Sequence, residues 1–219
     1  FGEEYLDKTD TNYISRLYYR HDRKLLRLNA DFQGKLMGDH FRWFAGMSHY
    51  NLHAASVDID KLNKGKAEED LLPDTASLYD KYIEWGVIPD AQKDGGITNL
   101  VKLGVVYDTR DNEASPQKGI WSEAVLITAP GFLGNDFGYS KISLTHRQYF
   151  TVVPKKLVFA YRLNYQGLIG GEIPFYMMPF YIRSLDTKDG LGGSKTLRGI
   201  LRNRVVGDGA VLGNLELRY

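Results

Sequence analysis

A glycine-rich segment near the C-terminal end of the chain is the first candidate for chemistry. Residues 190–196 read GLGGSKT, and phosphate-binding loops combine glycines with a lysine so that backbone amides and the lysine surround the phosphates. Such a loop requires glycine, lysine and serine or threonine in direct succession, whereas here Ser194 separates Gly193 from Lys195. No helical pattern follows the segment, so a nucleotide site is not expected.

Potential metal ligands and nucleophiles give no better site. His49 and His53 have a spacing that places two ligands on one side of a helix, but the pattern here predicts a strand that runs into a loop. The acidic residues between positions 58 and 70 lack the alternating ligands, the fixed glycine and the terminal glutamate of a calcium loop. The chain has no cysteine and no serine in a nucleophile elbow. We therefore expect no metal, no cofactor and no enzymatic activity.

Composition instead favours a membrane protein built of strands. The charge is nearly balanced, with 28 Lys and Arg against 27 Asp and Glu, and the chain contains 15 Tyr, 10 Phe and 23 Gly. Frequent aromatic residues and glycines are typical of outer-membrane barrels. No run approaches the length of about 18 apolar residues that a membrane-spanning helix needs. The first residues lack the features of a secretion signal, so a mature form or an internal piece is expected.

Alternation of apolar and polar residues with a period of two is the dominant pattern. In the stretch 157–167, Leu157, Phe159 and Tyr161 occupy one face while Ala160 and Arg162 occupy the other. Such stretches match the length of about 9–11 residues in barrel strands and exceed the average of about 5–6 in soluble proteins. About eight long strands are predicted, over residues 11–21, 25–34, 41–50, 99–108, 119–128, 138–150, 157–167 and 210–219.

The faces and connections of these strands predict a topology. The apolar faces are expected to meet lipid, with the least regular alternation in 119–128, where Glu123 shares a face with Trp121, Val125 and Ile127. Short connections alternate with long ones, as periplasmic turns and extracellular loops do. The short ones are 35–40, 110–118 and 151–155, the long ones are 51–98, 130–137 and 170–209, and 21–24 is a short exception. One amphipathic helix with an Asp74 or Thr75 cap is predicted near 75–85, either packed over the barrel mouth or used to bind a partner.

Two motifs carry a family resemblance. Leu197-Arg198-Gly199-Ile200, followed by a strand that contains Glu216, resembles the inward-folded loop and the next strand of the BamA/TamA-like outer-membrane assembly barrels, the bacterial surface antigen superfamily. The second motif is similar to a periplasmic hairpin of the same barrels, and its residues are Asp108, Arg110, Asp111, Asn112, Pro116 and Gly119. Ile200 stands where many members of the family have an aromatic residue.

The resemblance implies a fold and a contact. The fold is all-β, a transmembrane antiparallel barrel with one short helix in an extracellular loop. In this family the barrel has about sixteen strands, so residues 1–219 are expected to be the middle part of one such barrel, as a single domain. The loop enters the lumen, where Arg198 is expected to meet Glu216 on the wall while Leu197 and Ile200 pack. Loss of Arg198 would cost about 3–5 kcal/mol if this pair is buried and about 0–1 kcal/mol if it is exposed.

The function implied is assembly or translocation of other proteins at the outer membrane of a Gram-negative bacterium, without covalent chemistry. The expected partners are outer-membrane lipid, unfolded outer-membrane or exported protein substrates and accessory assembly subunits, with no nucleic acid. Three alternatives stay open: a passive pore, a small complete eight-stranded barrel, and a barrel with a fused upstream enzyme. A pore would favour anions because cations dominate the predicted inner face, namely Arg16, Arg27, Arg42, Lys141, Arg147 and Arg162.

Overall fold

The computed structural model describes residues 17–184, 186–194, 196–203 and 205–219. The chain divides into two compact units, one comprising Phe1–Leu26 with Asn51–Gly96 and the other Arg27–Tyr50 with Ile97–Tyr219. The larger unit holds most of the sheet, and the smaller one holds both short α-helices. In the part of the chain that is described, no helix has the length and apolar character needed to cross a membrane.

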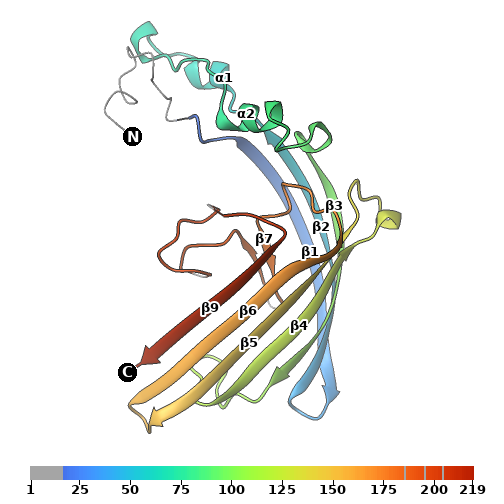
Figure 1. Cartoon of the computed structure of the whole chain (residues 1–219), viewed down its shortest axis with the longest axis vertical. Helices are drawn as coiled ribbons and strands as arrows, with labels where there is room; N and C mark the ends of the chain where they lie inside the picture. The colour runs from blue at the N-terminus through green and yellow to red at the C-terminus, as the bar shows by residue number, and fades with distance from the viewer. Residues whose placement is uncertain (1–16, 185, 195, 204) are drawn as a thin grey trace. The chain divides into compact units, whose positions relative to one another are not determined.

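Seven long strands form one sheet in the order β1-β2-β3-β4-β5-β6-β9 (Figure 1). Their lengths run from 10 to 16 residues, and every pairing from β3 to β9 is antiparallel. Strands that follow one another along the chain are neighbours in the sheet, except that residues 172–208 intervene between β6 and β9. The bounds are β1 (Asp22–Met37), β2 (Phe41–Ala55), β3 (Gly95–Asp108), β4 (Gly119–Ala129), β5 (Tyr139–Val153), β6 (Leu157–Gly171) and β9 (Gly209–Arg218).

The two faces of the sheet differ in what they contact. One face, here called the covered face, carries Glu123, Arg162 and Gln166 and is contacted by residues 172–208. The opposite apolar face carries exposed large side chains, among them Leu103, Leu126, Leu144, Leu163, Val211, Leu215 and Leu217. Side chains of a strand alternate between faces, so the apolar residues predicted to share a face do so. This part of the strand prediction is confirmed for these residues. The expectation that the apolar residues of every strand lie on this face is wrong for β4, where Trp121, Val125 and Ile127 lie on the covered face.

The irregular alternation in β4 has a structural reason. Trp121, Glu123, Val125 and Ile127 all lie on the covered face, where they are buried. Apolar residues are suitable there because this part of the covered face packs against a folded segment of the protein. The apolar face of β4 carries Ile120, Ser122, Ala124, Leu126 and Thr128.

The segment between β6 and β9, residues 172–208, is folded back across the strands of the larger unit (Figure 1). It contains a small antiparallel pair, β7 (Phe180–Ile182) and β8 (Thr187–Asp189). All three residues of β7 are buried, and the rings of Phe180 and Tyr50 lie 4.9 Å apart. We call residues 172–208 the docked loop.

One predicted strand is wrong where the structure describes it. Residues 11–16 lie outside the described residues, but Leu17–Tyr19 form a turn, in which Arg20 N–H donates to Leu17 O at 2.8 Å. Tyr18 O accepts a bond from Leu78 N–H, and the His21 ring stacks on Tyr79. These aromatic residues pack on a helix of the smaller unit, and β1 starts at Asp22. The predicted short connection 21–24 is therefore also wrong.

The smaller unit contains two short α-helices in place of the single predicted one, α1 (Ile59–Asn63) and α2 (Leu78–Glu84). The cap of α2 is Ser77, not Asp74 or Thr75, because Ser77 and Asp80 form a reciprocal capping box. Gly86 has a φ of 68° and follows the helix, as predicted for its end. The 3₁₀ turns are η2 (Glu68–Asp70) and η3 (Asp90–Gln92) here, and η4 (Gly131–Leu133) in the larger unit.

The long strands also extend beyond the predicted ends. β2 continues to Ala55 and β3 begins at Gly95, so the predicted connection 51–98 shortens to residues 56–94. A Cβ on Gly95 would lie 2.1 Å from Leu52 O, which explains why this close strand approach requires glycine.

Candidate functional site

The docked loop reverses its direction at positions that favour glycine. Gly192 has a φ of 107°, and a Cβ there would lie 2.7 Å from the carbonyl oxygens of Ile200 and Leu201. The Thr196 hydroxyl closes this turn, since it accepts from Gly192 N–H and donates to Gly192 O at 2.7 Å each. The glycine-rich stretch that was considered as a phosphate-binding loop is thus a structural element of the loop itself.

Gln166 on β6 holds the small strand β7 through its amide. Its side-chain nitrogen donates to Phe180 O at 3.2 Å, and its side-chain oxygen accepts from Ile182 N–H at 3.0 Å. Gln166 is buried. The amide therefore satisfies two buried backbone groups of β7, in the way that a neighbouring strand would.

Glu123 on β4 is the second residue that anchors the docked loop to the sheet. Its carboxylate accepts from Ser184 N–H at 3.1 Å, from the Ser184 hydroxyl, and from the Thr145 hydroxyl at 2.9 Å. Thr145 in turn accepts from the Asn164 amide at 2.7 Å. Glu123, Thr145 and Asn164 are direct register partners on β4, β5 and β6, and all three are buried. A buried carboxylate requires such bonds, so this chain across three strands fixes where the loop docks.

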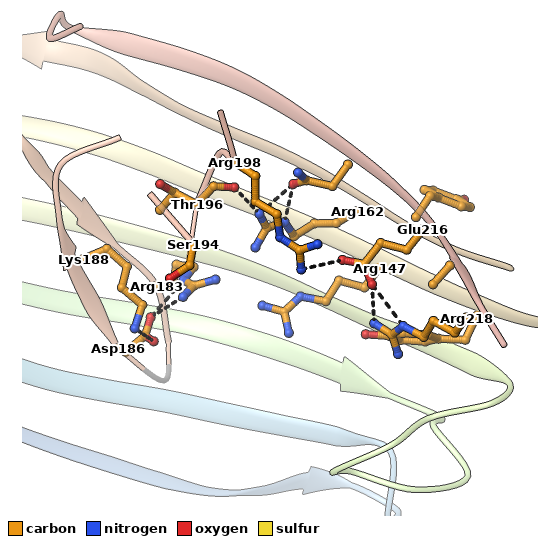
Figure 2. Close-up of a pocket in the computed structure, with 14 residues that line it drawn as sticks. Arg147, Arg162, Arg183, Asp186, Lys188, Ser194, Thr196, Arg198, Glu216 and Arg218 are labelled. Atoms are coloured by element: carbon orange, nitrogen blue, oxygen red, sulfur yellow. Dashed lines mark hydrogen bonds and ion pairs between the residues drawn. The ribbon is translucent and has the colours of Figure 1, made fainter. Parts of the chain in front are cut away.

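Arg162 provides a third contact, near the C-terminal half of the loop (Figure 2). Its guanidinium donates to Thr196 O at 2.7 Å. It also donates twice to the Asn214 side chain, at 3.0 and 2.6 Å, and Asn214 is its register partner on β9. The loop is thus bonded to β4, β6 and, through Arg162, to the residue opposite on β9.

The loop motif and its expected partner lie close together but near solvent. Arg198 Nη2 is 3.6 Å from Glu216 Oε1, and the two side chains are 77% and 35% exposed. Glu216 also accepts two hydrogen bonds from Arg218, at 3.0 and 2.9 Å. Gly199 has a φ of 87°, Leu197 is half-buried and Ile200 is exposed. The structure therefore brings the arginine and the acid together in an exposed ion pair.

The residues of the hairpin motif build one turn between β3 and β4. Asp108 accepts from the backbone N–H, Nε and Nη2 of Arg110, at 3.1, 2.9 and 2.9 Å, and both side chains are almost fully buried. These bonds raise the pKa of the Arg110 guanidinium above its usual value. The Arg110 guanidinium also lies over the Trp121 ring, at 5.9 Å from the ring centre.

The rest of this turn is closed by side-chain acceptors. Asp111 accepts from the backbone N–H groups of Gln117 and Lys118, which lower the pKa of its carboxyl. Asn112 accepts from the N–H groups of Ala114 and Ser115, Pro116 is buried, and Gly119 has a φ of 103°. A Cβ on Gly119 would lie 2.3 Å from Thr109 O. The motif thus accounts for the geometry of a tight turn.

The match to a family model decides the identification. A model of the Omp85 superfamily domain matches residues 10–218. The chain belongs to the Omp85 superfamily. The resemblance to the BamA/TamA-like surface antigen family is thereby confirmed at the superfamily level. A search of curated proteins found no match.

Members of the Omp85 superfamily are outer-membrane proteins that take part in the assembly and translocation of proteins there. They act on protein substrates and are not enzymes. Across the described parts of this Omp85 chain, no cluster of three or more His, Cys, Asp or Glu side chains could hold a metal ion. His49, one of the two histidines weighed as ligands, instead contacts the Asn99 side chain at 2.7 Å.

Sequence reasoning did not select Glu123 or Gln166 of this Omp85 domain as site residues. Glu123 did leave a signal, since it is a charged residue on the apolar side of an alternating strand. A lone acid there implies a buried partner. Gln166 left none, because nothing in the sequence distinguishes it from other polar residues on the same face.

Proposed function

We propose that this Omp85 chain forms part of a transmembrane β-barrel that inserts or exports other proteins at the outer membrane of a Gram-negative bacterium. The observation that carries the proposal is the docked loop, which is bonded by Glu123 and Gln166 to the polar face of long antiparallel strands. We further propose that residues 1–219 belong to one barrel domain of about sixteen strands.

The exposed apolar face supports a location in lipid. Within a bilayer, backbone N–H and C=O groups must be paired inside the protein, and an antiparallel sheet of long strands meets this requirement. Strands of 10 to 16 residues match the length that a tilted strand needs to cross the membrane. The loop supports a barrel larger than eight strands, because the interior of an eight-stranded barrel is filled by its own side chains.

The mechanism in this proposal is noncovalent. Strand edges of the barrel pair with a strand of the substrate, so that main-chain hydrogen bonds provide affinity. The docked loop keeps β4, β5 and β6 in one arrangement while other strands open or close. The partners are outer-membrane lipid, unfolded outer-membrane or exported proteins, and accessory assembly subunits.

Depletion of the protein in its native bacterium tests this function. The proposal expects the amounts of other folded outer-membrane proteins to fall, and expects a Glu123→Ala variant to restore them poorly. Glu113→Ala is the matched control, since Glu113 is an exposed acid of the hairpin turn and its side chain is 75% exposed. Normal levels of all other outer-membrane proteins after depletion would contradict the proposal.

A passive pore is the second candidate, favoured by the cationic character of the covered face. Arg147 and Arg162 lie directly opposite each other there, without a carboxylate partner in the described residues. A pore with such a wall would prefer anions. Anion-selective conductance in a planar bilayer, together with unchanged outer-membrane protein levels after depletion, would favour the pore over the assembly function.

A further inference from the structure

A cleft of about 350 Å³ lies between the docked loop and strands β5, β6 and β9 (Figure 2). Its charged lining is strongly unbalanced, with six cationic and two acidic side chains. The cations are Arg147, Arg162, Arg183, Lys188, Arg198 and Arg218, and the acids are Asp186 and Glu216. The lining therefore carries an excess of four positive charges.

Both acids are already engaged by other cations. Asp186 pairs with Arg183 and with Lys188, at 2.6 Å each. Glu216 is bonded to Arg218 and lies 3.6 Å from Arg198. In residues 17–219, outside the three undescribed positions, Arg147 and Arg162 form no ion pair with a carboxylate.

These two arginines lie close enough for their positive charges to repel each other. Arg147 on β5 and Arg162 on β6 are direct register partners on the same face, and like charges in this position destabilise a sheet. Among the residues that the structure describes, Arg162 donates hydrogen bonds to two neutral acceptors, the Asn214 side chain and the Thr196 carbonyl oxygen.

The guanidinium of Arg147 has fewer hydrogen-bond partners than that of Arg162. Its guanidinium lies over the Trp121 ring, 4.5 Å from the ring centre. Its Nε is buried and has no hydrogen-bond partner among the groups that the structure describes. A buried donor without an acceptor lowers the stability of a fold, so the guanidinium of Arg147, which also lines the cleft, has unused hydrogen-bonding capacity.

We propose that this cleft binds a phosphate-bearing anion between Arg147 and Arg162. Guanidinium groups form paired, charge-assisted hydrogen bonds to phosphate oxygens. A phosphate group offers more acceptor oxygens and more negative charge than a carboxylate, which suits a lining with this excess of positive charge. Arg183, Ser194 and Arg198 of the docked loop face the same cleft and supply further donors (Figure 2). A bound phosphate would thus join β5 and β6 to the loop.

Calorimetric titration of the full chain in a non-ionic detergent at low salt tests the proposal, with inorganic pyrophosphate as the probe. We expect saturable binding that weakens as sodium chloride is raised. Arg147→Gln and Arg162→Gln should each weaken binding by about tenfold or more, because each removes charge-assisted hydrogen bonds. Arg42→Gln is the matched control, since Arg42 lies on the same face, pairs with Asp108 and does not line the cleft.

A second arm distinguishes the source of the phosphate. Micelles that contain phosphatidylglycerol are added to the pyrophosphate complex, with neutral detergent micelles as the control. Displacement of pyrophosphate identifies a lipid phosphate as an occupant, and retention identifies a soluble phosphate compound. Either result supports the phosphate site.

Thermal unfolding separates lost binding from lost folding. Without a ligand, Arg147→Gln should unfold at the same temperature as the wild type or higher, because it removes a like-charge contact. Pyrophosphate should raise the unfolding temperature of the wild type more than that of Arg147→Gln. The proposal is overturned if the wild type binds no pyrophosphate, or if Arg42→Gln weakens binding as much as Arg162→Gln. These readouts measure binding and do not depend on the assembly function.

Discussion

The docked loop contacts the strands in two regions that differ in their exposure to solvent. In the first region, Glu123 and Gln166 are each 4% exposed and bond to residues 180–184. In the second region, the Arg198 side chain is 77% exposed and lies 3.6 Å from Glu216. Loss of a buried hydrogen bond to a charged group costs about 1.5–3 kcal/mol, whereas an exposed ion pair contributes about 0–1 kcal/mol.

The difference indicates that anchoring and accessibility are divided between the two regions. In the first region, the Glu123 carboxylate and the Gln166 amide are buried and bonded to the docked loop. Arg198 in the second region stays accessible at the edge of a cationic cleft. The arginine of the family motif is therefore expected to contribute little to the stability of the loop.

The largest effect is expected for Glu123→Ala. The substitution removes three hydrogen bonds and leaves the Ser184 N–H and the Thr145 hydroxyl without their acceptor. The free energy of unfolding in detergent should fall by about 3 kcal/mol or more, as measured by urea titration. Glu123→Gln should lose less because an acceptor oxygen remains. A loss no larger than that of the exposed control Glu113→Ala would remove the distinction between the two regions.

The second-largest loss of stability is expected for Gln166→Leu. The new side chain has a similar size but cannot bond to Phe180 O and Ile182 N–H, which stay buried. We expect a loss of about 1–3 kcal/mol in the same urea titration. Gln117→Leu, in the exposed hairpin turn, serves as the control and should change stability by less than about 0.5 kcal/mol.

A smaller effect is expected from the protonation of Asp186 within the loop. Burial disfavours the charged form, but hydrogen bonding from Lys188 and the charge of Arg183 outweigh it and hold the pKa of this carboxyl below its usual value. Its contribution to stability is therefore present above the unfolded pKa of about 3.9 and lost as pH falls through the lower folded pKa. Below this pH range, the Asp186→Asn variant and the wild type should exchange the amide hydrogens of β7 and β8 at the same rate. Above about pH 4, the variant should exchange faster than the wild type.

The smallest effect is expected for Arg198→Ala. Because the pair with Glu216 is exposed, the free energy of unfolding should change by only about 0–1 kcal/mol. Arg198→Lys is the matched control, since it keeps the charge and removes the planar guanidinium. A loss of about 3–5 kcal/mol, as a buried pair would give, would show that the second region anchors the loop as strongly as the first.

The strands could be predicted because their pattern is local. Five of the predicted strands lie within observed strands, and the predicted strands 138–150 and 210–219 each exceed an observed strand by one residue. Side-chain alternation assigned the faces of these strands except in β4. The strand predicted over residues 17–21 is wrong because aromatic residues fit a strand pattern but can equally well pack on a helix. His21 does so, since its ring stacks on Tyr79. The predicted strand over residues 41–50 was shorter than β2 because polar residues such as Asn51 and His53, which do not fit the apolar pattern, continue β2 in the structure.

The site could be predicted only where a motif marks it. The motif indicated the proximity of Arg198 and Glu216, but not their exposure, which depends on where the loop lies on the sheet. Glu123 and Ser184 are 61 positions apart in the chain, and their contact follows from a long-range fold that no local pattern encodes.

Hydrogen exchange at the amides of Ile182 and Ser184 tests the central claim most directly, since these N–H groups donate to Gln166 and Glu123. The full chain in lipid bilayers would be compared with Glu123→Ala and Arg198→Ala. We predict slow exchange at both amides in the wild type, faster exchange in Glu123→Ala, and wild-type rates in Arg198→Ala. Fast exchange in the wild type, or release of these amides by Arg198→Ala and not by Glu123→Ala, would contradict the account.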